Sequence, residues 1–196
     1  MNTFKALESV KTDQGNKLSI IEKSIDSLPE GELLIKVAYS SLNYKDALSA
    51  SGAPGVTKNY PHVPGIDAVG KVTESADEEF KEGDSVIVTG YDLGMNTSGG
   101  FGEYIRVPSA WAIKLPDGLS EKESMSLGTA GLTAGLSVQA LSDFNLAADF
   151  TQSKSIVTGS TGGVGSIALM LLAKLGSEVT AVTGKQDQKK LLSDLG

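Results

Sequence analysis

Alternating apolar and polar positions mark the chain up to about residue 115. Between residues 32 and 40, Leu33, Ile35 and Val37 alternate with a second face that includes Lys36, as in a half-buried strand. Five further strands are predicted between turn residues, at 4–9, 18–23, 68–73, 85–89 and 103–107. This part of the chain is therefore predicted to be a β-rich barrel or sandwich.

The pattern changes near Ser120, which precedes Glu121 and Glu123 as a helix cap followed by acidic residues. A helix is predicted over 124–141. Three glycines inside it would each weaken an isolated helix by roughly 1 kcal/mol relative to alanine. We therefore expect another backbone or a ligand to come close to them. They are Gly128, Gly131 and Gly135.

A β-α-β-α order follows this helix and predicts a parallel sheet. Its elements are a strand at 155–158, a helix at 164–175, a strand at 178–182 and a helix at 186–195. We therefore predict two domains. Residues 1–120 form the β-rich domain, and residues 121–196 form an α/β domain.

Composition and charge limit the possible functions. The chain has 196 residues, of which 40% are apolar and 21% charged, as in folded globular proteins. Its net charge of −7 argues against nucleic-acid or anionic-membrane partners. With no cysteine and one histidine, a catalytic metal site is not expected. The uncharged stretch 155–173 is too rich in glycine and hydroxyls for a membrane span, and without an apolar signal segment a cytoplasmic location is expected.

A glycine-rich turn joins the predicted strand 155–158 to the following helix, the context that a dinucleotide-binding fingerprint requires. Ser160 stands where the first glycine of G-x-G-x-x-G is expected, and Gly162 and Gly165 take the other two positions. The helix end would offer amides to a pyrophosphate. A purely structural turn is the alternative. The candidate coenzyme-binding residues here are Ser160, Thr161, Gly162, Gly163 and Val164.

The end of the next strand, about 20 residues on, distinguishes NAD from NADP. Thr183, Gly184 and Lys185 stand there, and no carboxylate follows until Asp187. A hydroxyl, a flexible residue and a cation favour the 2′-phosphate of NADP over a free ribose hydroxyl. The alternative is that Lys185 is an ordinary solvated lysine at a helix start.

Five segments of this sequence, taken in order, resemble one superfamily. They are Ser41–Ala47 (SLNYKDA), Pro64–Gly70 (PGIDAVG), Gly99–Tyr104 (GGFGEY), Gly128–Ala134 (GTAGLTA) and Thr158–Gly165 (TGSTGGVG). Together they resemble the medium-chain dehydrogenase/reductase superfamily, in its zinc-free quinone-oxidoreductase-like branch that includes acrylyl-CoA reductases. The resemblance implies a GroES-like catalytic domain, then a Rossmann domain, with NADPH between them. It also implies a homodimer for the full-length protein and a small-molecule substrate.

One departure from this family concerns length. A complete doubly wound domain has about six strands, and this chain supplies two. We therefore expect a C-terminally truncated protein. Residues 1–196 alone are expected to have little or no turnover, and an uncovered sheet edge would make them prone to associate.

The family and the missing metal ligands together indicate a reaction. Without zinc, an alcohol substrate lacks the Lewis acid that would lower its pKa, so reduction of an activated C=C bond is favoured. The hypothesis is hydride transfer from NADPH to the β-carbon of an enoyl-CoA, quinone or enone, followed by protonation of the α-carbon. Two alternatives stay open: a catalytically silent NADPH-binding sensor or structural protein, and a zinc-independent alcohol dehydrogenase.

The resemblance also implies roles for residues near Asn43. Tyr44 is placed beside the nicotinamide, where its ring would pack on the coenzyme and its hydroxyl would donate a proton, although solvent is an equal proton source. Asn43 would orient a carbonyl or the Tyr44 loop. Asp46 is either catalytic or a cap of the short helix that follows. Thr129 would meet the nicotinamide end, or make an intrahelical hydroxyl bond instead.

The remaining polar residues that stand out are given structural roles. Asp67 and Glu103 are interpreted as carboxylates under loops, and His62, between two prolines, as a turn residue and no more. Lys189 and Lys190 are interpreted as a solvated helix face.

Overall fold

The computed structural model describes residues 3–144 and 149–196. The chain divides into two compact units, Met1–Gly128 and Thr129–Gly196, which are described separately. The division falls inside a helix, at Gly128, whereas the sequence pattern placed it after residue 120.

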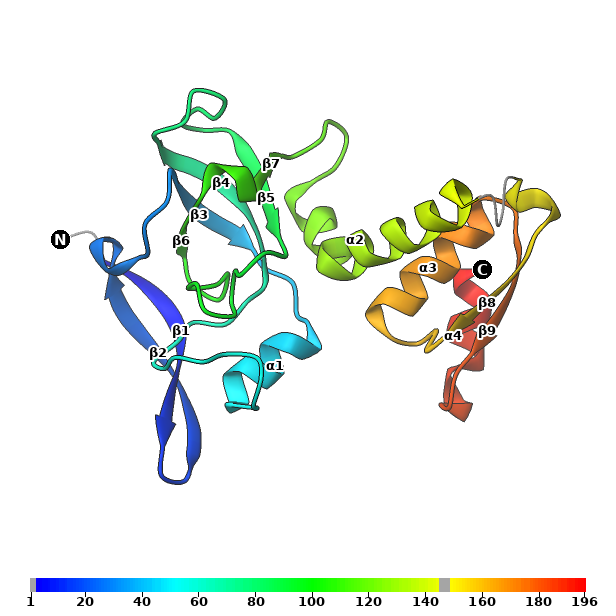
Figure 1. Cartoon of the computed structure of the whole chain (residues 1–196), viewed down its shortest axis with the longest axis horizontal. Coiled ribbons are helices and arrows are strands. Elements are labelled where there is room, and N and C mark those ends of the chain that lie inside the picture. Colours follow the sequence, from blue (N-terminus) through cyan, green and yellow to red (C-terminus); the bar gives the residue numbers. More distant parts are fainter. Residues whose placement is uncertain (1–2, 145–148) are drawn as a thin grey trace. The chain divides into compact units, whose positions relative to one another are not determined.

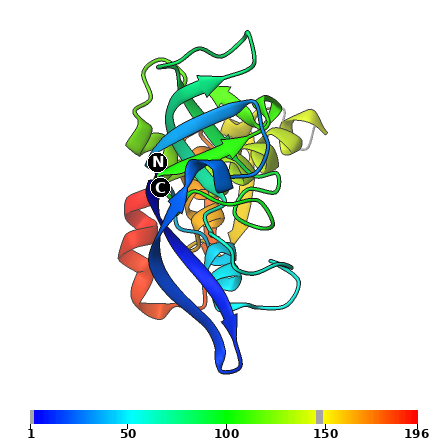
Figure 2. The same cartoon turned by 90° about the vertical axis from the view of Figure 1, so that its left-hand side faces the viewer.

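A long hairpin opens the first unit. Strand β1 (Thr3–Thr12) pairs antiparallel with β2 (Gly15–Ser24) along their whole length. Both strands were predicted, but shorter, because the residues next to the turn, 10–12 and 15–17, are mostly polar and carry no apolar alternation. Figure 2 shows the hairpin projecting from the rest of this unit.

The other edge of β1 is held by later segments of the chain. The amide of Leu7 donates to the carbonyl of Phe101 at 2.8 Å, and the amide of Glu103 donates to the carbonyl of Lys5 at 3.0 Å. The Glu103 carboxylate also accepts from the Lys5 amide at 2.7 Å, in agreement with the structural role predicted for it. The base of the hairpin is thereby tied to residues about 100 positions away.

A five-stranded antiparallel sheet forms the body of the first unit, in the order β6-β3-β4-β5-β7 (Figure 1). Its strands are β3 (Leu33–Tyr39), β4 (Asp67–Ser75), β5 (Ser85–Thr89), β6 (Tyr104–Val107) and β7 (Ala112–Lys114). The predicted β-rich half is confirmed. Strand β7 was missed because three residues are too few to show an alternation.

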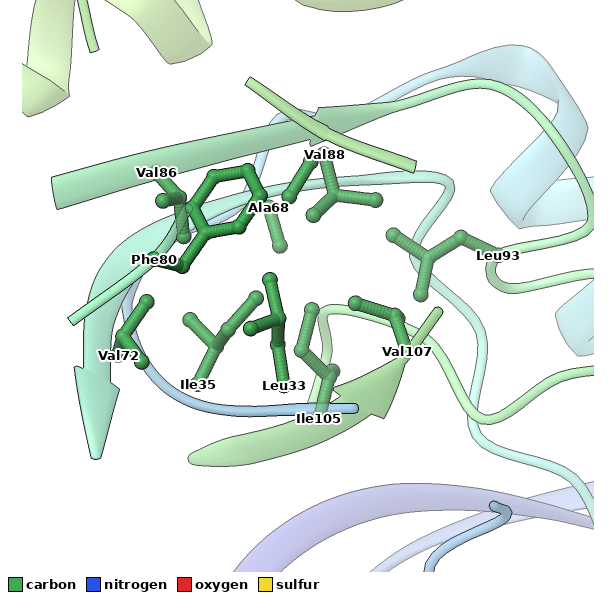
Figure 3. Close-up of a cluster of buried hydrophobic side chains, with 11 residues drawn as sticks. Leu33, Ile35, Ala68, Val72, Phe80, Val86, Val88, Leu93, Ile105 and Val107 are labelled. Atoms are coloured by element: carbon green, nitrogen blue, oxygen red, sulfur yellow. The ribbon is translucent and has the colours of Figure 1, made fainter. Parts of the chain in front are cut away.

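Alternate residues of these strands build one apolar core. Leu33 and Ile35 of β3 point toward Val86 and Val88 of β5, and Phe80 closes one side (Figure 3). Burying a side chain of this size stabilises a fold by roughly 1.5–3 kcal/mol before entropy is counted. The alternation read from the sequence is thus the packing pattern of the sheet.

Short helices occupy the connections of this unit. Helix α1 (Tyr44–Ser51) lies between β3 and β4, and single turns of 3-10 helix, η1 (Ile25–Ser27) and η2 (Ser109–Trp111), follow β2 and β6. Helix α1 is the short helix expected after Asp46, but it begins at Tyr44, so Asp46 lies in its first turn.

Helix α2 (Glu121–Asp143) begins in the first unit and continues into the second. The amide of Glu123 donates to Ser120 Oγ at 3.2 Å, and its carboxylate accepts from the Ser120 amide at 2.9 Å. This reciprocal pair is a capping box, which confirms Ser120 as the cap. The helix is longer than the predicted 124–141 and is interrupted at Gly128.

The second unit has the predicted β-α-β-α order. Strand β8 (Lys154–Thr158) pairs in parallel with β9 (Glu178–Val182), and α3 (Gly163–Lys174) packs on this pair (Figure 1). Its core includes Val138, Val157 and Leu172. The last predicted helix, α4 (Lys189–Leu195), begins three residues later than predicted, because Gln186–Gln188 form a 3-10 turn, η4. Another 3-10 turn, η3 (Phe150–Gln152), precedes β8.

His62 is more than the turn residue that the sequence indicated. Its backbone pairs with Ser9 of β1 through two hydrogen bonds, of 2.7 and 2.9 Å. The side chain is buried, and its Nε2 makes no hydrogen bond within the part of the chain that the structure describes. The flanking prolines suggested a turn, but His62 forms an isolated β-bridge to β1 between them.

Candidate functional site

The start of α1 carries the candidate residues Asn43, Tyr44 and Asp46. Asp46 is buried, and its two carboxylate oxygens accept the amides of Asn43 at 2.7 Å and Ile66 at 2.9 Å. Burial raises the pKa of this carboxyl above its ordinary value, and the two amide hydrogen bonds oppose that change. The bond from the Asn43 amide supports the interpretation of Asp46 as a helix cap. The bond from the Ile66 amide also ties α1 to the Pro64–Ile66 segment.

Asn43 is held by a second buried carboxylate. Asp67 is fully buried and accepts hydrogen bonds from Ser41 Oγ and, at 3.0 Å, from Asn43 Nδ2. Asn43 Nδ2 also lies 2.9 Å from Ser41 Oγ. The Asn43 amide is thereby fixed before α1 begins. Ser41 was not among the predicted site residues, although it opens the SLNYKDA segment.

Tyr44 contrasts with these buried neighbours. It is the first residue of α1, and 81% of its surface is exposed. The network of Ser41, Asn43 and Asp67 fixes the helix start that carries it, while its ring stays accessible. This arrangement suits a ring that packs against a bound molecule.

Gly128 lies against this same network. Its backbone, at φ 50° and ψ −153°, is non-helical and lies in a region that L side chains rarely adopt. A Cβ here would stand 2.5 Å from Asp67 Oδ2 and 2.9 Å from Ser41 Oγ. The expectation that a helix glycine marks a close approach is therefore confirmed at Gly128. At Gly135 no other part of the protein lies within 4 Å, so only the approach of a ligand stays a prediction there.

The glycine-rich turn lies in the second unit, between β8 and α3. Gly159, at φ 61°, takes the tight turn, and its carbonyl accepts from the Gly162 amide at 2.8 Å. A Cβ on Gly165 would stand 2.4 Å from that carbonyl oxygen, so the predicted close packing there is confirmed. The amides of Gly163 and Val164 begin α3 and have no partner four residues earlier within the helix. Both residues are exposed, and their free amides lie at the positive end of the helix dipole.

Ser160 does not have the position that the sequence assigned to it. The tight-turn role of the first fingerprint glycine belongs to Gly159, one residue earlier. Ser160 is fully buried, and its hydroxyl donates to the carbonyl of Val157 at 2.7 Å. Its side chain is therefore turned into the protein and is not available to a coenzyme. Thr161 is half-buried, and its hydroxyl lies 3.3 Å from that of Thr183.

The candidate 2′-phosphate residues follow β9. The Lys185 amide donates to Thr183 Oγ1 at 3.1 Å, which folds the 183–185 segment into a tight loop. Thr183 and Lys185 line a cavity of about 440 Å³ together with Lys189 of α4. Lys189, interpreted from the sequence as part of a solvated face, thus adds a second cation to this cavity. Lys190 instead pairs with Asp194 at 2.8 Å.

Two kinds of feature are absent from the described ranges 3–144 and 149–196. No helix there is long and apolar enough to cross a membrane. No group of three or more histidine, aspartate or glutamate side chains there is arranged to hold a metal ion.

Comparison with known proteins agrees with this geometry. Residues 29–117 match the family described as the alcohol dehydrogenase GroES-like domain. This segment is a GroES-like domain. The network of Ser41, Asn43 and Asp67 lies within it, and the Rossmann-like β-α-β-α region follows.

Whole-chain similarity extends beyond the GroES-like domain. The acrylyl-CoA reductase AcuI of Ruegeria pomeroyi is 43% identical over 98% of this chain and 58% of its own length. The structure of Escherichia coli YhdH with bound NADPH superposes with a TM-score of 0.92 at 41% identity, covering 97% of this chain and 58% of that one. The structure of Bacillus subtilis YhfP with bound NAD superposes with a TM-score of 0.93 at 43% identity, covering 100% of this chain and 59% of that one.

These similarities confirm the resemblance to the medium-chain dehydrogenase/reductase superfamily and the predicted fold class, a GroES-like domain followed by the start of a Rossmann domain. The chain spans somewhat more than half the length of the relatives it matches.

Proposed function

We propose that the full-length protein is an NADPH-dependent oxidoreductase that reduces the activated C=C bond of an enoyl-CoA, quinone or enone. The single observation that carries the proposal is that one unit contains both an exposed helix amino end at Gly163 and the Thr183–Lys185 loop at the end of the neighbouring strand. Similar proteins hold NADPH or NAD, and one is named an acrylyl-CoA reductase.

The residues present fit the coenzyme. The exposed amides of Gly163 and Val164 suit a pyrophosphate, because they combine hydrogen-bond donors with the positive end of a helix. Lys185, with the hydroxyl of Thr183, would hold the 2′-phosphate, and Lys189 would add positive charge to the same cavity. NADPH, when bound, supplies the hydride.

The residues of the GroES-like domain would act on the substrate side. Tyr44 would pack its exposed ring on the nicotinamide, and its hydroxyl would donate to the substrate. Asn43 and Asp46 are held by backbone and carboxylate partners, so they would position Tyr44. Thr129, which begins the second unit, would approach the nicotinamide end. Reduction of this kind needs mainly alignment and hydrogen-bond donors aimed at the developing enolate oxygen.

Turnover with a panel of acceptors tests the reaction class. With the full-length protein, NADPH oxidation is followed with acryloyl-CoA, with a quinone and with an enone, and NADP reduction is followed with simple alcohols. Rapid oxidation by acryloyl-CoA or the quinone is the expected result. Tight NADPH binding without oxidation by any acceptor would favour the sensor alternative, and steady NADP reduction by alcohols would favour the alcohol dehydrogenase.

A charge reversal tests the coenzyme site separately. Lys185→Glu should raise the Kd for NADPH at least about tenfold, or about 1.4 kcal/mol, because a carboxylate would then face the 2′-phosphate. The Kd for NADH should change much less. Lys190→Glu is the matched control, since Lys190 pairs with Asp194 instead of lining the cavity. Unchanged NADPH affinity in Lys185→Glu would remove Lys185 from the site.

A further inference from the structure

Buried serine hydroxyls fasten β8 to β9 at both ends. At the amino end, Ser177 Oγ lies 2.8 Å from Ser153 Oγ and 2.8 Å from Ser155 Oγ. Ser177 is buried, and it joins the segment before β9 to the start of β8. We call these three residues the amino-end clamp.

Ser160 forms the clamp at the carboxyl end. Its hydroxyl donates to the Val157 carbonyl at 2.7 Å and accepts from the Val182 amide at 3.1 Å. The Ser160 amide donates to the Val182 carbonyl at 3.2 Å. One buried residue thus holds the last residue of β9 by both of its backbone groups. We call this the carboxyl-end clamp.

The carboxyl-end clamp lies between the two halves of the candidate coenzyme site. Ser160 follows the tight turn at Gly159, which leads to the amides of α3, and Val182 is the residue just before Thr183. The amino-end clamp is at the opposite end of the same two strands. The two clamps therefore make similar hydrogen bonds, but only one of them adjoins residues that would contact a coenzyme.

We propose that Ser160 is a positioning residue for coenzyme selectivity, because its buried hydroxyl sets the spacing between the glycine turn and the Thr183–Lys185 loop. This inference rests on the proposed NADPH site. Ser160 does not touch the coenzyme, since it is fully buried. It acts through Val182, whose position determines where the 183–185 loop begins.

The effect should differ between the two coenzymes. NADPH uses both anchors at once, the amides of α3 for its pyrophosphate and Lys185 for its 2′-phosphate, so it depends on the spacing between them. NADH has no 2′-phosphate and depends mainly on the first anchor. A hydrogen bond of ordinary strength changes an equilibrium constant by roughly two- to twelvefold. Loss of the Ser160 hydroxyl should therefore weaken NADPH binding by about fivefold.

The experiment compares Ser160→Ala with Ser177→Ala. The Kd for NADPH and for NADH is measured by fluorescence titration, and Tm by thermal unfolding. Both variants should lower Tm, because each removes hydrogen bonds between the same strands. Only Ser160→Ala should lower the ratio of NADPH to NADH affinity, by about fivefold. An unchanged ratio in Ser160→Ala, or an equal loss in Ser177→Ala, would overturn the proposal.

Hydrogen exchange in the unaltered protein gives a second measurement that does not depend on a variant folding. The Val182 amide should be protected before any coenzyme is added, because it already donates to Ser160 Oγ. Exchange at the rate of an exposed loop amide would contradict a preset spacing. If the unaltered protein binds neither coenzyme, the proposed function fails. If it prefers NADPH and Ser160→Ala prefers it equally, only the role of Ser160 fails.

Discussion

The two oxygens of Asp46 each accept a hydrogen bond from a backbone amide, and Oδ2 of Asp67 accepts from the side chains of both Ser41 and Asn43. Both carboxylates are buried inside the GroES-like domain, whereas the ring of Tyr44 beside them is exposed. Buried carboxylates with internal partners stabilise the geometry of a site, and exposed rings meet its ligands. In this part of the candidate site, the accessible side chain of Tyr44 is therefore carried by a helix start that buried hydrogen bonds hold in place.

The sequence indicates this segment but not how its side chains are arranged. The SLNYKDA motif indicated Asn43, Tyr44 and Asp46 without showing which of them faces solvent. That distinction comes from Asp67, 24 positions after Asn43, whose carboxylate reaches back to the Asn43 side chain. Contacts over such a distance leave no periodic signal in the sequence.

His62 gives a stability prediction that depends on pH. Burial lowers the pKa of its imidazole below the ordinary value of 6.5. The unfolded chain therefore binds the proton more readily, and stability should fall as the pH drops below about 6.5. Each unit by which the pKa is lowered corresponds to about 1.4 kcal/mol once the pH is below the folded value.

Denaturant unfolding at a series of pH values checks this prediction. His62→Leu is the control, because an apolar side chain fills the site without a titratable group. Its stability should change less between pH 7 and pH 5.5 than that of the unaltered protein. Parallel curves for the two proteins would show that His62 does not carry the dependence.

The break in α2 determines which of its glycines are required. Gly128→Ala should destabilise the protein by about 1–3 kcal/mol, because it puts a Cβ against Asp67 in a backbone region unfavourable to alanine. Gly135→Ala should instead be neutral or stabilising by up to about 1 kcal/mol, since open space surrounds that position. Denaturant unfolding of both variants measures the difference. Equal effects would show that the break at Gly128 is not needed.

Among the elements, the sequence predicted those that have a strong local pattern. The strand at 85–89 and the strand at 178–182 were predicted with the observed bounds. Strand β7 and the 3-10 turns η1, η2 and η3 were missed because each has only three residues, and the turn η4 was predicted as the start of the last helix. The end of the β1–β2 hairpin, at 10–12 and 15–17, was missed because its backbone pairing does not require apolar side chains.

At the scale of the whole molecule, the two units have separate cores. The core around Leu33 and Val86 lies in Met1–Gly128, and the core around Val157 and Leu172 lies in Thr129–Gly196. We therefore expect a polypeptide of residues 1–128 to fold by itself, with a cooperative denaturant transition. Leu33→Ala in this polypeptide should lower its stability by about 2–5 kcal/mol.

Circular dichroism and amide NMR dispersion measure this outcome. Dispersed amide signals and a sigmoidal transition are expected for residues 1–128. A disordered spectrum would show that this unit needs residues after Gly128 for its stability. Glu22→Gln, at an exposed position of β2, serves as the control substitution and should leave the transition unchanged.

The attachment of β1 to Phe101 and Glu103 has a consequence for the order of synthesis. The first strand to leave the ribosome can pair with β2 early, but its second edge pairs with His62 only after that residue has emerged, and with Phe101 and Glu103 later still. An unpaired strand edge is a site for wrong association. During translation, the backbone hydrogen bonds of β1 are therefore complete only after residue 103 has emerged.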